Sequence, residues 1–110
     1  MIIYFLDNTV TLVGGNGTHE GNVFVDGMPV CDYGWDLNDA WVVCRQLGFV
    51  SVVDFTKNSQ FGKVPTWFRM AYANCQGDES ALSDCPHQKV SYCYSYNGAG
   101  VQCSTEVRSK

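Results

Sequence analysis

Six cysteines in a chain of 110 residues limit the possible folds more than any other feature of this sequence. They stand at Cys31, Cys44, Cys75, Cys85, Cys93 and Cys103. None has the CxxC spacing that zinc ribbons and redox-active dithiols need, and neither His19 nor His87 is placed as a metal ligand beside a cysteine pair. An even number of cysteines in so short a chain is typical of a disulfide-linked domain in an oxidising compartment. The sequence therefore predicts three disulfides, with the pairing still open, and an extracellular location.

Length and charge narrow the class of protein further. The chain is long enough for one compact domain, and with 45% hydrophobic and 16% charged residues it has enough apolar surface to fold. Its formal net charge is -4 and its seven Lys and Arg residues are scattered, so nucleic acid is not expected as a specific partner. The longest apolar runs fall far below the roughly 20 residues of a transmembrane helix. The first residues lack the basic segment and cleavage site of a signal peptide, so we expect a longer precursor.

Local patterns predict short strands separated by turns. In chain order we expect strands over residues 9–13 and 22–25, a hairpin to 29–31, a loop over 49–64, a strand over 66–71 and an alternating segment over 90–103. Asp26-Gly27 is typical of the turn in a tight hairpin, and Asn97-Gly98 interrupts the last segment.

Helix signals occur at two places. Asp36 is a good N-cap, Asp39 three residues later can close a capping box, and apolar residues recur at helical spacing until Gly48 ends the helix. A second, short helix is expected from an N-cap at Asp78 to Cys85, where a proline follows. No internal repeat or low-complexity tract interrupts these elements.

Six motifs follow one another in an order that resembles a known family. They are TLVGG at 11–15, EGNV at 20–23, VCDYGWD at 30–36, DAWVVCRQLGF at 39–49, CQGDESAL at 75–82 and AGVQC at 99–103. In this order they are similar to the motifs of the scavenger receptor cysteine-rich family. The resemblance covers residues 9–103, which we take as the domain, with residues 1–8 and 104–110 as flanks. Phe49 stands where the eight-cysteine branch has a cysteine, so the chain resembles the six-cysteine group A branch.

This resemblance carries expectations about fold and function. It implies an α+β fold in which a curved antiparallel sheet cradles one α-helix, with a short second helix at the edge. It also implies the disulfides Cys31–Cys93, Cys44–Cys103 and Cys75–Cys85. The implied function is that of an extracellular, non-catalytic module that recognises protein, polyanionic or glycan ligands, including microbial surface polymers, as in scavenger and innate-recognition receptors. The alternatives are an accessory targeting domain of a secreted mosaic protease or oxidase, and an adhesion module.

Many members of the family hold calcium through acidic residues, and this chain matches that set only in part. Asp32 stands at the first acidic position, but Tyr33 replaces the second and Asn97 replaces a glutamate. Calcium prefers about six to eight oxygen ligands, several of them carboxylates. One interpretation is a weakened cation site formed by Asp32, Asn97 and either Asp36 or Asp39. In the other, Asp36 and Asp39 only cap the helix and Asp32 is a solvated loop charge. No cofactor is required, and we expect calcium binding to be weak or absent.

Tyrosines gather around one of the implied disulfides. That bond would bring Tyr33 close to Tyr92, Tyr94 and Tyr96 at one end of the domain. Tyrosine offers a large contact area at low entropic cost and keeps a polar tip, so clustered loop tyrosines suit protein or glycan recognition. We predict that Tyr33, Tyr94, Tyr96 and Asn97 form a ligand-binding surface. The alternative is that some of these rings pack on the sheet.

The remaining candidate residues have structural or processing interpretations. Trp35, Trp41 and Trp67 lie at or beside positions that match core residues of the family, so we expect them to pack in the interior. Asn16 begins an Asn-Gly-Thr sequon in a glycine-rich stretch, which predicts glycosylation of a secreted chain. No recognisable nucleophile motif accompanies the histidines, and the cysteines would be oxidised, so we expect no enzymatic activity.

Overall fold

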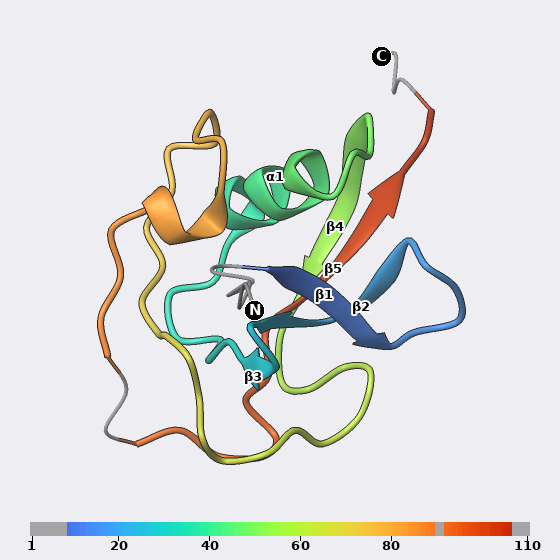
Figure 1. Ribbon diagram of the computed structural model, residues 1–110. Helices are drawn as coiled ribbons and strands as arrows, with labels where there is room; N and C mark the ends of the chain where they lie inside the picture. Colours follow the sequence, from blue (N-terminus) through green and yellow to red (C-terminus); the bar gives the residue numbers. More distant parts are fainter. Residues whose placement is uncertain (1–8, 90–91, 107–110) are drawn as a thin grey trace, which may run out of the picture.

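The computed structural model describes residues 9–89 and 92–106, which form an α+β fold (Figure 1). In chain order the elements are β1 (Val10–Gly14), β2 (Glu20–Val25), β3 (Met28–Pro29), α1 (Leu37–Gln46), β4 (Ser51–Thr56), the 3₁₀ turn η1 (Leu82–Asp84) and β5 (Gly100–Ser104). The strands form one antiparallel sheet in the order β1-β2-β5-β4, and β3 pairs with β2. The predicted antiparallel sheet with one main helix is confirmed. No helix in the described ranges has the length and apolar character needed to cross a membrane.

Two glycines set the geometry of the sheet. In the turn between β2 and β3, Asp26 and Gly27 have φ of 52° and 82°, the left-handed conformation of tight hairpin turns, as the Asp-Gly pair predicts. Gly100 begins β5 between two neighbouring strands. A Cβ atom there would lie 2.2 Å from Thr56 Oγ1 and 2.9 Å from the Gly21 carbonyl oxygen. Only glycine therefore allows the close approach of β2, β5 and β4 at this point.

Helix α1 packs over β4 and β5 and begins as its capping residues predict (Figure 1). The Asp36 carboxylate accepts from the Asp39 N–H at 3.1 Å, and the Asp39 carboxylate accepts from the Asp36 N–H at 2.9 Å, which is a capping box. Gly48, with φ of 92°, follows the last turn. The buried face of the helix joins the core of the domain, whose other members include Val23, Val25, Trp35, Met70, Leu82 and Val101. This core fixes the helix against the sheet.

All three disulfides implied by the family are confirmed. Cys31–Cys93 joins the segment after β3 to the segment before β5, Cys44–Cys103 joins α1 to β5, and Cys75–Cys85 closes the loop that contains η1. The six cysteines are all paired, so no thiol is free to act as a nucleophile or a metal ligand.

Two secondary-structure predictions for the segment after α1 are wrong. Residues 51–56, predicted as loop, form β4, whose pairing with β5 shifts register between Val52 and Asp54. This irregularity breaks the simple alternation that would have indicated a strand. Residues 66–71, predicted as a strand, form only isolated bridges at Met70 and Ala71. Met70 forms a parallel bridge with Val30, flanked by hydrogen bonds from the Arg69 N–H to the Pro29 carbonyl and from the Cys31 N–H to the Met70 carbonyl, and the pairing extends no further.

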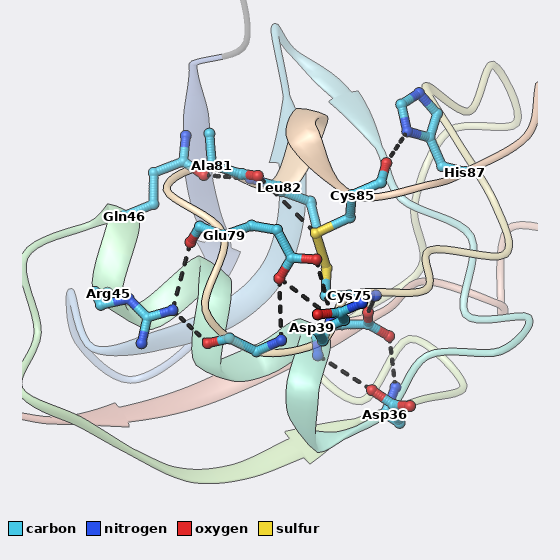
Figure 2. Close-up of a disulfide and its surroundings, with 12 residues drawn as sticks. Asp36, Asp39, Arg45, Gln46, Cys75, Glu79, Ala81, Leu82, Cys85 and His87 are labelled. Carbon is cyan, nitrogen blue, oxygen red and sulfur yellow. Dashed lines mark hydrogen bonds between the residues drawn. A yellow bond between two sulfur atoms is a disulfide. The ribbon is translucent and has the colours of Figure 1, made fainter.

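The predicted second helix is much shorter than expected. Instead of spanning 78–85, it is the 3₁₀ turn Leu82–Asp84, and its N-cap position is Ala81, not Asp78. The reason lies in the preceding loop (Figure 2). There the Glu79 carboxylate accepts hydrogen bonds from backbone N–H groups of the loop itself, the closest at 2.9 Å. From α1, the Arg45 guanidinium donates to carbonyl groups of the same loop. The Glu79 side chain thus folds back onto the loop, and the Glu79 carbonyl, which an α-helix over 78–85 would use in its own ladder, accepts from Arg45 instead.

Candidate ligand-binding surface

A tight turn presents the predicted tyrosines. The Asn97 N–H donates to the Tyr94 carbonyl at 2.8 Å, so residues 94–97 form a turn before β5. The rings of Tyr94 and Tyr96 stack with their centroids 5.5 Å apart and an angle of 6° between their planes. Tyr94 is 53% exposed and Tyr96 is 56% exposed. These rings therefore project from the domain and do not pack on the sheet, and strand β5 begins only at Gly100.

The backbone of this turn is fixed at several points. The Ser95 carbonyl accepts from the Val64 N–H at 2.8 Å and from the Ser59 hydroxyl at 2.7 Å. The Gly98 N–H donates to the same hydroxyl at 2.8 Å. The Asn97 carbonyl accepts from the Asp32 N–H at 2.9 Å, and the neighbouring Cys93 is bonded to Cys31. The tyrosines therefore stand on a preorganised turn, which reduces the entropy lost on binding.

Tyr33 completes the group that the sequence predicts. Its ring is half-buried against the disulfide Cys31–Cys93, and its centroid lies 5.7 Å from that of Tyr72 at an angle of 49°. Desolvation raises the pKa of the Tyr33 phenol, and the neighbouring Tyr94 and Asp32 raise this pKa further. Tyr33 thus lies beside the 94–97 turn. We call Tyr33, Tyr94, Tyr96 and Asn97 the aromatic surface.

The structure adds residues that the sequence did not indicate. A pocket of about 320 Å³ adjoins the aromatic surface, and its lining is Tyr33, Ala71, Tyr72, Gln88, Lys89, Tyr92 and Tyr94. Of these, Ala71, Tyr72, Gln88, Lys89 and Tyr92 were not among the predicted ligand-binding residues. Ala71 and Gln88 exchange two backbone hydrogen bonds, of 3.0 and 2.9 Å, which bring segments distant in sequence together. No local pattern signals such an isolated pairing.

The candidate calcium ligands are engaged in hydrogen bonds with the backbone. Asp32, expected under one interpretation to be a solvated charge, is 2% exposed, and its carboxylate accepts from the Asn58 N–H at 2.6 Å. Asp36 and Asp39 form the capping box described above. Asn97 approaches Asp32 through its backbone carbonyl.

A separate group of potential metal ligands lies near η1. Cys75, Glu79 and Cys85 offer ligand atoms within 4.8 Å of one another in the described part of the chain (Figure 2). The two sulfur atoms form a disulfide, and the Glu79 carboxylate accepts backbone N–H donors. Thiolate, not disulfide sulfur, is the metal ligand. This group is therefore a structural element of the loop.

Two of the three tryptophans pack in or beside the core as expected, and the Asn16 sequon lies in an exposed loop. Trp35 is buried and its indole N–H donates to the Gly100 carbonyl at 2.9 Å, and Trp41 packs at the edge of the core. The prediction for Trp67 is wrong, because this side chain is 64% exposed while the adjacent Phe68 packs against the Cys31–Cys93 disulfide. Asn16 is exposed in the loop between β1 and β2.

Comparison with known proteins identifies the fold and its class. The family model of the scavenger receptor cysteine-rich domain matches residues 13–104. A scavenger receptor cysteine-rich domain superfamily protein of Patiria pectinifera is 43% identical over 91% of this chain, and the macrophage scavenger receptor types I and II of Bos taurus is 42% identical over 89%. The third such domain of murine neurotrypsin superposes with a TM-score of 0.79 and 34% identity, covering 91% of this chain and 98% of that domain.

These similarities define an extracellular, disulfide-linked, non-catalytic ligand-binding module. The chain belongs to the scavenger receptor cysteine-rich family, and its six paired cysteines are consistent with group A. It spans 9% of the matched Patiria protein and 23% of the matched bovine receptor.

Proposed function

We propose that this domain recognises an extracellular ligand through the aromatic surface, without a calcium ion as a bridge. The observation that carries the proposal is the stacked, half-exposed pair Tyr94 and Tyr96 on a turn that is anchored by four hydrogen bonds and a disulfide. Rigid exposed tyrosines dominate binding energy in many interfaces. We propose protein, polyanionic or glycan molecules, including polymers of microbial surfaces, as the ligands.

The chemistry of the acidic residues supports recognition without calcium. The Asp32 carboxylate is buried and accepts a short hydrogen bond from the loop that contains Asn58. Withdrawing it toward an ion would leave that N–H without its acceptor. Asp36 is committed to the helix cap, and Tyr33 and Asn97 add no negative charge. Because charge count and flexible oxygen ligands tune calcium affinity, this donor set fits the ion poorly.

Binding to bacterial cells tests the role of the tyrosines. We expect the labelled domain to bind heat-killed Gram-positive or Gram-negative cells or immobilised dextran sulfate. The double change Tyr94→Ala and Tyr96→Ala should lower this binding by about tenfold or more, because two central aromatic anchors are lost. Thermal stability should change little, since both rings are more than half exposed.

The matched control removes an exposed apolar side chain elsewhere. Val50 is 52% exposed, and its N–H donates to the Ser104 carbonyl, at the opposite end of β5 from the tyrosine turn. Val50→Ala should bind like the parent domain. Equal binding by the tyrosine double variant and the parent would show that the aromatic surface is not the recognition site.

We also propose that Asn16 carries a glycan in the natural protein, whether this is secreted or is the ectodomain of a membrane protein. Asn16 is exposed in the β1–β2 loop, within an Asn-Gly-Thr sequon. Mass spectrometry of material secreted from eukaryotic cells should show the sequon occupied, and Thr18→Ala should remove the added mass. A sequon that is bare in all secreted material would disprove this proposal.

The role of the parent protein stays a separate proposal. A receptor ectodomain or secreted recognition protein fits a domain that carries its own binding surface. The alternatives are an accessory targeting domain of a secreted mosaic protease or oxidase, and an adhesion module. The domains that accompany this one in the complete precursor distinguish among the three.

A further inference from the structure

We infer that the pocket beside the aromatic surface binds a phosphocholine group, with tyrosine rings around the quaternary ammonium and Lys89 at the phosphate. This inference rests on the proposed aromatic surface and names a ligand class for it. The pocket volume of about 320 Å³ falls within the range of about 300 to 1,000 Å³ that is typical of small-molecule sites. It is therefore large enough for one such group.

The lining points to a quaternary ammonium. Four of its residues are tyrosines, namely Tyr33, Tyr72, Tyr92 and Tyr94. Ring faces attract cations through their quadrupole, and clusters of rings recognise trimethylammonium groups. The rings of Tyr33 and Tyr72 are inclined by 49°, so they form a corner and not the flat platform on which a sugar ring would stack. A corner of rings suits a compact, rounded cation.

The backbone holds one of these rings in place at a conformational cost. Tyr72 has φ of 56°, a left-handed conformation that is uncommon for residues other than glycine. The hydrogen bond from its N–H to the Tyr33 carbonyl, 3.0 Å long, fixes this conformation. Ala71 and the Cys31–Cys93 disulfide form an apolar cluster against which the Tyr33 ring packs. Strained residues of this kind are concentrated at binding sites, where the surrounding structure maintains them.

Lys89 determines that the ligand carries an anion as well. A bare cation in the pocket would be repelled by this ammonium, whereas a neighbouring phosphate would pair with it. Gln88 also lines the pocket, and a glutamine amide can donate to a phosphate oxygen. A zwitterionic phosphodiester of choline supplies both the cation for the rings and the phosphate for Lys89.

Titration with glycerophosphocholine, followed by amide NMR shifts, tests the inference. We expect saturable shifts at Tyr33, Tyr72 and Lys89, and weaker binding of glycerophosphoethanolamine by about fivefold or more, because its primary ammonium is more strongly hydrated and lacks the methyl groups. Equal affinity for the two compounds, or no saturable shift with glycerophosphocholine at millimolar concentration, would overturn the inference.

Single substitutions test the tyrosine part and the lysine part of the site independently. Tyr72→Asn tolerates the left-handed backbone but removes the ring, and it should weaken glycerophosphocholine binding by about fivefold, whereas Tyr72→Phe should bind within about twofold of the parent. Lys89→Met should weaken glycerophosphocholine by about two- to fivefold and leave tetramethylammonium binding undiminished. Lys57→Met, an exposed lysine outside the pocket lining, is the charge control. Unchanged binding in Tyr72→Asn, or equal losses in both lysine variants, would contradict the site.

A vesicle-binding experiment identifies which kind of molecule carries the phosphocholine group. It also allows the pocket inference to fail separately from the proposed function. Phosphatidylcholine vesicles that bind the domain in competition with glycerophosphocholine would assign a lipid headgroup. Binding of the soluble compound without binding of vesicles would assign a phosphocholine that is borne by another molecule. Tyr96 does not line the pocket. If glycerophosphocholine fails to bind while cell capture still depends on Tyr94 and Tyr96, the pocket inference is wrong and the proposed function stands.

Discussion

Replacing Cys44 and Cys103 together by alanine is expected to lower the free energy of unfolding by about 4 kcal/mol. The two residues are 59 positions apart in sequence and join α1 to β5 in the centre of the fold. In the chain-entropy model, a disulfide stabilises by restricting the unfolded chain, and the effect increases with the length of the closed loop. This bond closes a loop of more than half the domain, so its loss should be among the most destabilising changes.

The disulfide Cys75–Cys85 provides a matched control, because its cysteines are only 10 positions apart. Its double alanine variant should lose about 3 kcal/mol by the same model. Chemical denaturation of both variants and the parent measures the difference. A larger loss for Cys75–Cys85 than for Cys44–Cys103 would show that local packing, not loop closure, determines how these bonds stabilise the domain.

The free energy of unfolding should also depend on pH through Asp39, by roughly 2 to 4 kcal/mol. Asp39 is fully buried, and burial raises the pKa of its carboxyl group from 3.8 to about 7. The hydrogen bonds that this carboxylate accepts from the Cys75 and Asp36 N–H groups oppose the shift. Between pH 3.8 and about pH 7, Asp39 keeps its proton in the folded state but has lost it in the unfolded state. The contribution of Asp39 to stability is therefore present below pH 3.8 and decreases as the pH rises to about 7.

The variant Asp39→Asn isolates this effect. Asparagine stays neutral at all these pH values and its carbonyl can still accept from the Cys75 N–H, so the difference in unfolding free energy between parent and variant should shrink as pH rises. Asp78→Asn, which removes an exposed carboxylate outside the capping box, is the control. A difference that grows with pH would mean that the two N–H donors outweigh burial and hold Asp39 ionised.

Features that depend on local chemistry were predictable from the sequence. The capping box of Asp36 and Asp39 requires only residues three positions apart, and the β2–β3 hairpin follows from an Asp-Gly pair. The three disulfides were predicted from the family resemblance, since cysteine spacing alone does not determine pairing. The implied Cys31–Cys93 bond also predicted that Tyr94 and Tyr96 lie close to Tyr33.

Features that depend on contacts distant in sequence were not predictable. Strand β4 contains a bulge that hides its alternation, and the loop before η1 is held by Arg45, which lies more than 30 positions away on α1. Trp67 and Phe68 are adjacent apolar residues, and only the fold shows that Phe68 faces the disulfide. Tyr72 and Lys89 meet in one pocket because Ala71 pairs with Gln88. The hydrophobic pattern carries no sign of such single pairings.

Capture of bacterial cells at controlled free calcium tests the calcium-independent aromatic surface most directly. The parent domain should bind equally well in EDTA and in millimolar calcium, and Asp32→Asn, which retains an acceptor for the Asn58 N–H, should bind like the parent. Capture that is lost in EDTA, restored by calcium and abolished by Asp32→Asn would contradict this mechanism and show that an ion held by Asp32 carries recognition.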